Sequence, residues 1–329
     1  MRTRPRPLGL TALLAAALLA PRLAAQRDFS GVQVTTTPVA GKISLLEGAG
    51  GNIGVSAGPD GILMVDDQFA PLSERIRKAL DALGTGGPRY IVNTHFHGDH
   101  TGGNAFFGKD GTIVAQENVR TRLLSPRDTA GQHEEAAPPE ALPVITFRQS
   151  VSLHWNGEEI RIIHLPSGHT DGDSIVWFTG SNVVHLGDHF FNGKFPFIDV
   201  NGGGDVLGYM HNVDTLVAKL PADAQLIPGH GPLGRMDDLK AFEHMLQVTI
   251  GIVQGSLKAG RTLEQIQAEG LPAEWADWGT GFVDTKHWLQ IVHDGLQRSP
   301  NGPTTGEAPD FGPPPAAAAP AAPVKPAGR

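Results

Sequence analysis

The segment at residues 95–100, HFHGDH, constrains this chain more than any other part of its sequence. Side chains alternate along a strand, so His95 and His97 at a strand end would point in the same direction. The chain can turn at the glycine that follows, which would bring Asp99 and His100 back toward the same space. Imidazole and carboxylate groups together suit zinc, with iron or manganese as the next choices. The segment therefore predicts a metal site, and a solvated His-rich turn is the alternative.

Three further segments place a histidine or an aspartate in a glycine-rich turn directly after a run of strand-forming residues. Loops at strand ends are where a rigid sheet presents reactive side chains, and a neighbouring glycine lets the backbone come close to a metal. Each segment taken alone is well explained as a turn or a helix cap. Together with residues 95–100 they form one set of candidate metal ligands. The added members are His169, Asp188 and His230.

The first half of the chain reads mainly as strands. β-rich runs begin at residues 32–35 and continue to residue 67, with a hairpin signal at residues 58–61. Apolar residues recur at helical spacing over residues 72–83 and stop before a glycine, which predicts a helix there. Residues 125–143 are polar and proline-rich, and we expect a loop near the candidate site.

A second block of strands lies between residues 151 and 228, and helices lie within and after it. The helices are expected at 205–220, 236–259, 262–268 and 284–297. The order is therefore strands and helix, then strands and helices again. Two βα halves, each burying one sheet face under helices, predict an α/β fold with the layers of a four-layer αβ/βα sandwich.

The first 25 residues have the pattern of a secretory signal peptide. Three arginines precede an apolar run at residues 8–20, which is too short to cross a bilayer, and small residues precede Gln26. We therefore expect cleavage after residue 25 and a periplasmic or secreted bacterial protein. An uncleaved anchor helix is the alternative, which the length of the run disfavours.

The end of the chain has a different composition. Residues 299–329 are rich in proline, glycine and alanine and have few large apolar side chains, so we expect a disordered tail. The stretch that remains, 26–298, is long enough for one large α/β domain. Its last part, 236–298, is expected to form helices that pack on that domain.

Charge and cysteine content limit the partners of the chain. Without residues 1–25, four of 26 basic side chains are lost and 22 remain against 34 acidic ones, a net charge of −12 with histidine neutral. No basic stripe is available for a nucleic acid. There is no cysteine, hence no disulfide and no lipid-attachment site. We expect a small-molecule substrate, no nucleic acid and no membrane span after signal cleavage; the oligomeric state stays open.

The complete set of candidate residues resembles that of the metallo-β-lactamase superfamily of metal-dependent hydrolases. The resemblance covers about residues 30–250 and rests on motifs that occur in family order. These are Asp66, the 95–100 segment, His169, Asp188 and His230. The resemblance implies an αβ/βα sandwich with two metal ions between its sheets, and it identifies 26–298 as a metallo-β-lactamase-like hydrolase domain.

The resemblance also implies a division of the ligands between two zinc ions. One ion would be held by His95, His97 and His169, and the other by Asp99, His100 and His230, with Asp188 bridging both. Asp66 would lie behind the ligands and orient one of them. A strand-end cap is the alternative for Asp66, and Asp67 competes for the same role.

The implied chemistry is hydrolysis by metal-bound hydroxide. Two neighbouring ions can share a water molecule, lower its pKa and polarise a carbonyl or phosphoryl oxygen. Asp99 is the candidate catalytic residue, which would orient the hydroxide or pass a proton to the leaving atom. Three imidazoles on one ion also leave an open position, as in catalytic rather than structural zinc sites.

An aspartate at position 188 limits the range of candidate substrates. Secreted metallo-β-lactamases usually carry Cys or Ser at the bridging position, whereas Asp resembles glyoxalase II, lactonases and phosphodiester hydrolases. We therefore expect an exported dinuclear zinc hydrolase acting on a small ester, lactone or amide-like substrate, with β-lactams among the candidates. Two alternatives are a periplasmic metal-binding accessory protein without turnover and an iron-dependent redox member of the superfamily.

Residues that contact the substrate are harder to predict. His189, next to Asp188, is the best candidate among the other histidines to line the site, and Lys194 is a candidate anchor for a substrate carboxylate, although most lysines are simply solvated. Four phenylalanines in the same segment either wall the substrate or pack in the core: Phe190, Phe191, Phe195 and Phe197. Three tryptophans late in the chain are expected to pack: Trp275, Trp278 and Trp288.

Overall fold

A computed structural model describes residues 28–84, 86–129, 132–299, 301–302 and 308–313. The chain divides into a unit Met1–Gly31, of which residues 28–31 are described, and a unit Val32–Arg329 that contains every element below. The predicted signal peptide, 1–25, lies outside the described residues. Among the described residues, none of the helices is both long and apolar enough to cross a membrane.

The first sheet has the strand order β1-β2-β3-β4-β5-β6-β9. Its strands are β1 (Thr35–Ala40), β2 (Ile43–Glu47), β3 (Ile53–Gly58), β4 (Gly61–Val65), β5 (Pro88–Val92), β6 (Thr112–Gln116) and β9 (Ile145–Phe147). The first four strands form an antiparallel meander, and β4, β5, β6 and β9 run parallel. The predicted hairpin is present, because Gly58 of β3 pairs with Gly61 of β4.

The second sheet has the order β10-β11-β12-β13-β14-β15. Its strands are β10 (Ser150–Trp155), β11 (Glu158–His164), β12 (Ser174–Phe178), β13 (Val183–His185), β14 (Gln225–Ile227) and β15 (Gly234–Arg235). Only the pair β13–β14 is parallel, and the connection between these two strands contains a helix, as a parallel pair requires.

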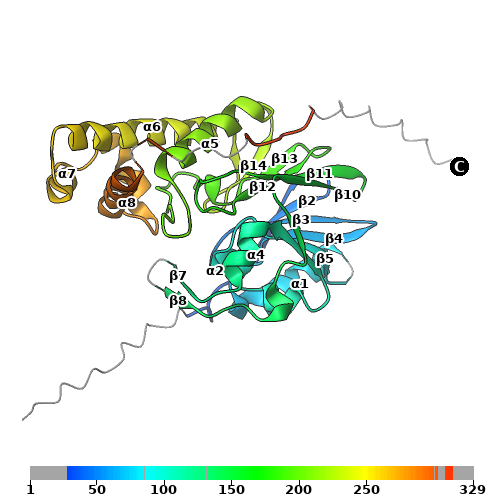
Figure 1. Ribbon diagram of the computed structural model, residues 1–329. Coiled ribbons are helices and arrows are strands. Elements are labelled where there is room, and N and C mark those ends of the chain that lie inside the picture. The colour runs from blue at the N-terminus through cyan, green and yellow to red at the C-terminus, as the bar shows by residue number, and fades with distance from the viewer. Residues whose placement is uncertain (1–27, 85, 130–131, 300, 303–307, 314–329) are drawn as a thin grey trace, which may run out of the picture. The chain divides into compact units, whose positions relative to one another are not determined.

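The helices are α1 (Ser73–Leu83), α2 (Gly98–Thr101), α3 (Asn104–Phe107), α4 (Glu117–Leu123), α5 (Val206–Lys219), α6 (Met236–Lys258), α7 (Leu263–Glu269) and α8 (Thr285–Arg298). Short 3₁₀ turns occur at η1 (Ala70–Leu72), η2 (Pro139–Ala141), η3 (Gly187–His189) and η4 (Ala273–Thr280). The sheets face each other, with α1 and α4 outside the first and α5, α6 and α8 outside the second (Figure 1).

The side chains of β12 show why the layers form. Val176 and Phe178 belong to a buried cluster that also contains Leu63 of β4, so they fill the space between the sheets. Ile175 and Trp177 point to the opposite face and belong to a cluster with residues of α5, α6 and α8. A strand that is apolar on both faces can be covered on both sides. The predicted four-layer αβ/βα sandwich is therefore confirmed.

The structure differs from the sequence prediction at several short elements. No strand forms at residues 32–34, because pairing with β2 begins only at Thr35, opposite Glu47. The segment 125–143 is not all loop, since β7 (Arg127–Thr129) and β8 (Gln132–Glu134) pair as a hairpin. β9 and β15 were not predicted, because strands of two or three residues show too few alternating positions.

Part of the predicted disordered tail is packed. Within 299–329, residues 308–313 are described, and the Phe311 side chain is only 9% exposed in the cluster under α5, α6 and α8. Arg161 of β11 donates from Nη1 to the carbonyl oxygen of Phe311 at 2.8 Å and to that of Pro313. The prediction of an unpacked tail is wrong for this segment, and residues 314–329 lie outside the described part.

Candidate metal centre

Each candidate ligand follows the end of a strand. β5 runs into His95 and His97, and α2 begins directly after His97, with Asp99 and His100 in its only turn. Amide hydrogen bonds from His100 and Thr101 to the carbonyl of His97, both 3.0 Å, fold this turn back. The turn predicted after His97 is therefore one turn of helix, and it brings all four side chains to one place.

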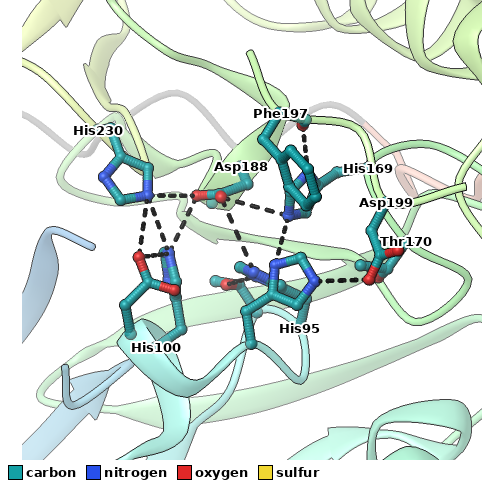
Figure 2. A network of polar contacts seen from close by, with 12 residues as sticks. His95, His100, His169, Thr170, Asp188, Phe197, Asp199 and His230 are labelled. Atoms are coloured by element: carbon teal, nitrogen blue, oxygen red, sulfur yellow. Dashed lines mark hydrogen bonds and ion pairs between the residues drawn. The ribbon is translucent and has the colours of Figure 1, made fainter. Parts of the chain in front are cut away.

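The remaining ligands come from the second sheet. His169 follows β11, Asp188 lies in η3 after β13, and His230 follows β14. The backbone amide of Gly229 donates to the carbonyl of Gly187 at 2.8 Å, which fixes the last two loops against each other. Candidate ligands 130 residues apart in sequence, His100 and His230, therefore meet between the two sheets (Figure 2).

The first group consists of His95, His97, His169 and Asp188. One possible ligand atom from each lies within 4.8 Å of all the others. Nδ1 of His97 and Nε2 of His169 are 2.9 Å apart. Oδ2 of Asp188 lies 3.3 Å from Nε2 of His169 and 3.9 Å from Nε2 of His95. All four side chains are buried.

The second group consists of Asp99, His100 and His230, whose ligand atoms also lie within 4.8 Å of one another. Nε2 of His100 and Nε2 of His230 are 3.4 Å apart, and Oδ2 of Asp99 lies 3.4 Å from Nε2 of His230. Asp99 and His230 are 26% and 25% exposed at their side chains, whereas His100 is fully buried. The cluster therefore opens to solvent at Asp99 and His230.

Asp188 lies between the two groups and divides its two oxygens between them. Oδ2 faces the first group, as described above, and Oδ1 lies 3.1 Å from Nε2 of His100 and 3.4 Å from Nε2 of His230. The structure thus gives Asp188 the position that the resemblance implied for a bridging ligand. The assignment of the seven side chains as ligands stays a prediction that agrees with this arrangement.

Hydrogen bonds hold the outer ring nitrogens of His95 and His169. The Thr94 hydroxyl lies 3.0 Å from Nδ1 of His95, and Nδ1 of His169 donates to the carbonyl oxygen of Phe197 at 2.7 Å. Within the described chain, the buried Nε2 of His95 has no hydrogen-bond partner. Both rings therefore turn Nε2 toward the cluster.

Carboxylates orient the other two buried histidines. Oδ2 of Asp66 lies 2.7 Å from Nδ1 of His100, and Oδ2 of Asp199 lies 3.0 Å from Nε2 of His97. Such partners fix the ring and favour an unprotonated nitrogen on the metal side. Asp199 was not predicted from the sequence: it follows no strand and has no neighbouring motif.

The carboxylate of Asp66, rather than that of Asp67, contacts a ring of the histidine cluster. The Asp66 carboxylate also accepts hydrogen bonds from the amide and the hydroxyl of Thr94, both 2.7 Å. Asp66 has a backbone φ of 61°, which is unusual for a residue with a side chain and is maintained here by these contacts. Asp67 instead accepts from the amide of Gly103 at 2.8 Å, and burial raises its pKa well above the ordinary value.

The cluster fits a pair of cations. Nδ1 of His97 and Nε2 of His169 face each other at 2.9 Å. The other ring nitrogen of each histidine already contacts the Asp199 carboxylate or the Phe197 carbonyl. The two facing nitrogens therefore present lone pairs, which repel each other unless a cation or a proton lies between them. Five imidazoles and two carboxylates are the donor set that zinc, iron and manganese accept in proteins.

The pKa directions differ between the two groups. Burial and the neighbouring His100 hold the pKa of His95 well below its ordinary value, and burial lowers the pKa of His169 to about 4. Burial acts in the same direction on His100, but Asp188, Asp99 and Asp66 outweigh it and raise the pKa well above the ordinary value. The pKa of His230 is raised in the same way, chiefly by Asp188 against burial.

The predicted substrate residues have different outcomes. His189 is 1% exposed, stacks on Tyr209 at 5.4 Å and accepts a hydrogen bond from Asn212 at 3.1 Å. Burial lowers its pKa to about 3, so its ring is neutral at neutral pH. Its role as a substrate contact stays a prediction. Lys194 is half-buried, and its role as an anion anchor stays a prediction.

The aromatic residues separate into two sets. Phe190 and Phe195 are buried in the core, where they contact Phe242 and Trp288 respectively. Phe191 and Phe197 lie instead against the histidine rings. Trp275 and Trp288 are buried, and Trp278 packs against the same core, as expected from the sequence.

Comparison with known proteins gives one family match. Residues 41–230, more than half of the chain, match the Metallo-beta-lactamase superfamily. The chain is 23% identical over 168 residues to "Metallo-beta-lactamase type 2" of Bacteroides fragilis, which covers 51% of this chain and 62% of that protein. It is 29% identical over 144 residues to "Hydroxyacylglutathione hydrolase" of Nitrosococcus oceani, which covers 43% and 47%.

The solved structures agree on the fold. The crystal structure of DIM-1 metallo-beta-lactamase superposes with a TM-score of 0.54 at 17% sequence identity, over 66% of this chain and 99% of that one. The chain thus spans between about half and three fifths of the two curated relatives but nearly all of this smaller structure. The matched region ends at His230, the last of the candidate ligands.

Proposed function

This chain belongs to the metallo-beta-lactamase superfamily, and from that premise we propose that it is a metal-dependent hydrolase with two zinc ions. Its substrate is a small ester, lactone or amide-like molecule. The two relatives named above are a β-lactamase and a hydroxyacylglutathione hydrolase, whose names both denote hydrolysis at an acyl carbonyl. This agreement supports an acyl substrate for the present chain.

The position of Asp188 carries the proposal. Its Oδ1 lies 3.1 Å from His100 and its Oδ2 lies 3.3 Å from His169, so one carboxylate reaches both histidine groups. A single structural metal would need only one of these groups. Two ions at these positions would supply Lewis acidity and an activated water molecule.

The protein groups have separable roles in such a reaction. His95, His97 and His169 would hold one ion, and His100, His230 and Asp99 the other. Asp99 also lies at the solvent-exposed edge of the cluster. Burial opposes ionisation of Asp99, but His100 and His230 outweigh it and lower its pKa. Its carboxylate is therefore charged at neutral pH and is placed to orient a water molecule and accept its proton.

The substrate class follows from the residue at position 188 and from the absence of cysteine in the sequence. With aspartate there, the site differs from the β-lactamases that carry Cys or Ser at the bridging position and is closer to the lactonase and glyoxalase II pattern. β-Lactams remain candidate substrates, because ring-opening of a strained amide needs the same attack on a carbonyl carbon. Lys194 would anchor a substrate carboxylate.

We also propose that the protein is exported to the periplasm or secreted. The support is the basic and apolar pattern of residues 1–25 followed by small residues. Fractionation of expressing cells with N-terminal sequencing of the product tests this proposal. We expect an extracytoplasmic protein that begins at Gln26; a cytoplasmic protein that retains Met1 would contradict it.

A substrate panel on zinc-loaded and on iron-loaded protein tests the proposed reaction. It contains nitrocefin, homoserine lactones, thioesters, simple esters and phosphodiesters. We expect hydrolysis of at least one carbonyl substrate by the zinc form, and His95→Ala to lose both metal and at least 100-fold of the rate. His211→Ala removes an exposed histidine of α5 and serves as the matched control. Two bound ions with no turnover of any substrate would contradict the proposal.

A further inference from the structure

Two aromatic rings lie directly against the histidine cluster. Phe191 stacks on His230, with ring centroids 5.0 Å apart and planes inclined by 19°. Phe197 lies 6.0 Å from the ring of His97 and 6.1 Å from that of His169, and Figure 2 shows it beside His169. The polar ligand atoms are therefore bordered by aromatic surface.

This aromatic border continues to the protein surface through Phe282. The ring of Phe282 meets that of Phe197 edge-to-face at 6.3 Å, and both rings lie 6.4 Å from His287. Phe282 is 65% exposed. Among the described residues, three other large apolar side chains are exposed, and none belongs to a segment that forms the cluster. They are Leu124, Val144 and Ile145.

The chain on both sides of the exposed Phe282 is anchored to the rest of the fold. The next residue, Val283, is 1% exposed, and Asp284 caps α8 by accepting a hydrogen bond from the amide of His287 at 2.8 Å. On the other side, the carbonyl of Trp278 accepts from the amide of Phe195 at 3.1 Å. Phe282 is thus exposed to solvent between two anchored residues, Trp278 and Val283.

Phe282 and His287 also come from outside the family match. That match ends at residue 230, whereas Phe282 lies between η4 and α8 and His287 lies in the first turn of α8. Figure 1 shows α8 in orange beside α6 on the outer side of the second sheet. The helical segment that follows the family region therefore contributes side chains to the border of the cluster, where the substrate of this particular chain would be recognised.

We propose that Phe197 and Phe282 form a subsite for an apolar acyl or aryl group of the substrate. This inference rests on the proposed hydrolase function in one respect: that function places the carbonyl group of the substrate at the histidine cluster. A fixed apolar ring in water, continuous with a polar reaction centre, gains free energy when a ligand covers it. Binding sites of this kind combine apolar walls with a few polar groups that fix orientation.

Binding of two carboxylates tests the subsite without turnover. Calorimetric titration of the zinc-loaded protein compares acetate with 4-phenylbutyrate, which share the carboxylate and differ in the aryl chain. We expect 4-phenylbutyrate to bind about tenfold more tightly, the gain for removing roughly 50 Å² of apolar surface from water. Phe282→Ala should remove most of this advantage and leave the affinity for acetate unchanged. Val144→Ala, at an equally exposed apolar residue, should behave as wild type.

Turnover gives a second and separate measurement. For the 4-nitrophenyl esters of the same acids, Phe282→Ala should raise KM about tenfold for the phenylbutyrate ester and leave kcat unchanged, because a uniform binding contact is lost. Equal affinity of wild type for the two carboxylates, or equal loss for both in Phe282→Ala, would overturn the subsite even if hydrolysis occurs. A preference for 4-phenylbutyrate without hydrolysis of any substrate would support the subsite and overturn the hydrolase proposal.

Discussion

Four histidines of the cluster each use one ring nitrogen for a contact with the surrounding protein and turn the other nitrogen toward the cluster. His95, His100 and His169 use Nδ1 for an outer hydrogen bond, whereas His97 uses Nε2, toward Asp199. The outer partner decides which nitrogen is left for a metal. Pattern recognition in the sequence identifies the histidines but not this choice, because the partners come from other segments.

The ionisation of these histidines leads to a prediction about metal binding and pH. In the metal-free protein the pKa of His100 and His230 is raised, so both rings hold a proton to higher pH than an ordinary imidazole, whereas the pKa values of His95 and His169 are lowered. A metal must therefore compete with protons more strongly at the first pair than at the second. We therefore expect the ion at His100 and His230 to be lost first when the pH falls.

Metal content after dialysis at fixed zinc concentration, between pH 8 and pH 5, measures this order. The content should fall from two ions to one before it falls further, and calorimetry should show more proton release for the second ion than for the first. The His230→Ala variant should bind one ion and lose it only at the lower pH of the second step. His211→Ala should show the same two steps as the wild type. Simultaneous loss of both ions would contradict the assignment.

Sequence patterns pointed to the candidate ligand residues because each of their segments contains a glycine at the end of a β-rich run. The residues that orient them were harder to find. Asp66 was named through family resemblance, but Thr94 and Asp199 belong to common residue types with no spacing signal, and only the folded chain places them behind His95 and His97. His189 follows Asp188 directly in the sequence, but its ring stacks on Tyr209, and its role as a substrate contact stays a prediction.

Among the elements, long periodic segments were predicted well and short ones were not. α5, α6 and α8 agree with their predicted ranges to within one or two residues, because three or more turns supply enough apolar positions. The tail segment 308–313 was missed, since its one large apolar residue, Phe311, gives no pattern. The residue that binds this segment, Arg161 of β11, is also distant in sequence. The guanidinium of Arg161 lies 5.6 Å from the ring of Trp177.

The packing of this tail segment gives a prediction about stability. Phe311→Ala should lower the free energy of unfolding by about 2 kcal/mol, because a buried phenyl ring is removed and its burial contributes roughly 1.5–3 kcal/mol. Urea denaturation followed by tryptophan fluorescence measures the change. Phe282→Ala removes the same side chain from an exposed position and should change stability by less than about 0.5 kcal/mol. Equal effects of the two substitutions would show that the tail segment does not pack in solution.

On the scale of the whole molecule, the ligand cluster joins the two halves of the sandwich. The loop after β5 of the first sheet supplies His95, His97, Asp99 and His100, and loops of the second sheet supply His169, Asp188 and His230. Without cations, these side chains place imidazoles and carboxylates together in a buried space. Each ion bound there would contact both halves at once, so its binding free energy also opposes their separation.

Removal of the metal should therefore destabilise the entire fold. A ligand that binds only the folded protein, present at 1,000 times its dissociation constant, adds about 4 kcal/mol, so we expect chelation to lower Tm by roughly 10 °C for a chain of this size. Differential scanning calorimetry with zinc and after exhaustive chelation measures the shift. Asp188→Ala, which removes the side chain shared by both groups, should have a low Tm that zinc raises only slightly. An unchanged Tm in wild-type protein whose two ions have demonstrably been removed would show that the cluster does not connect the sheets energetically.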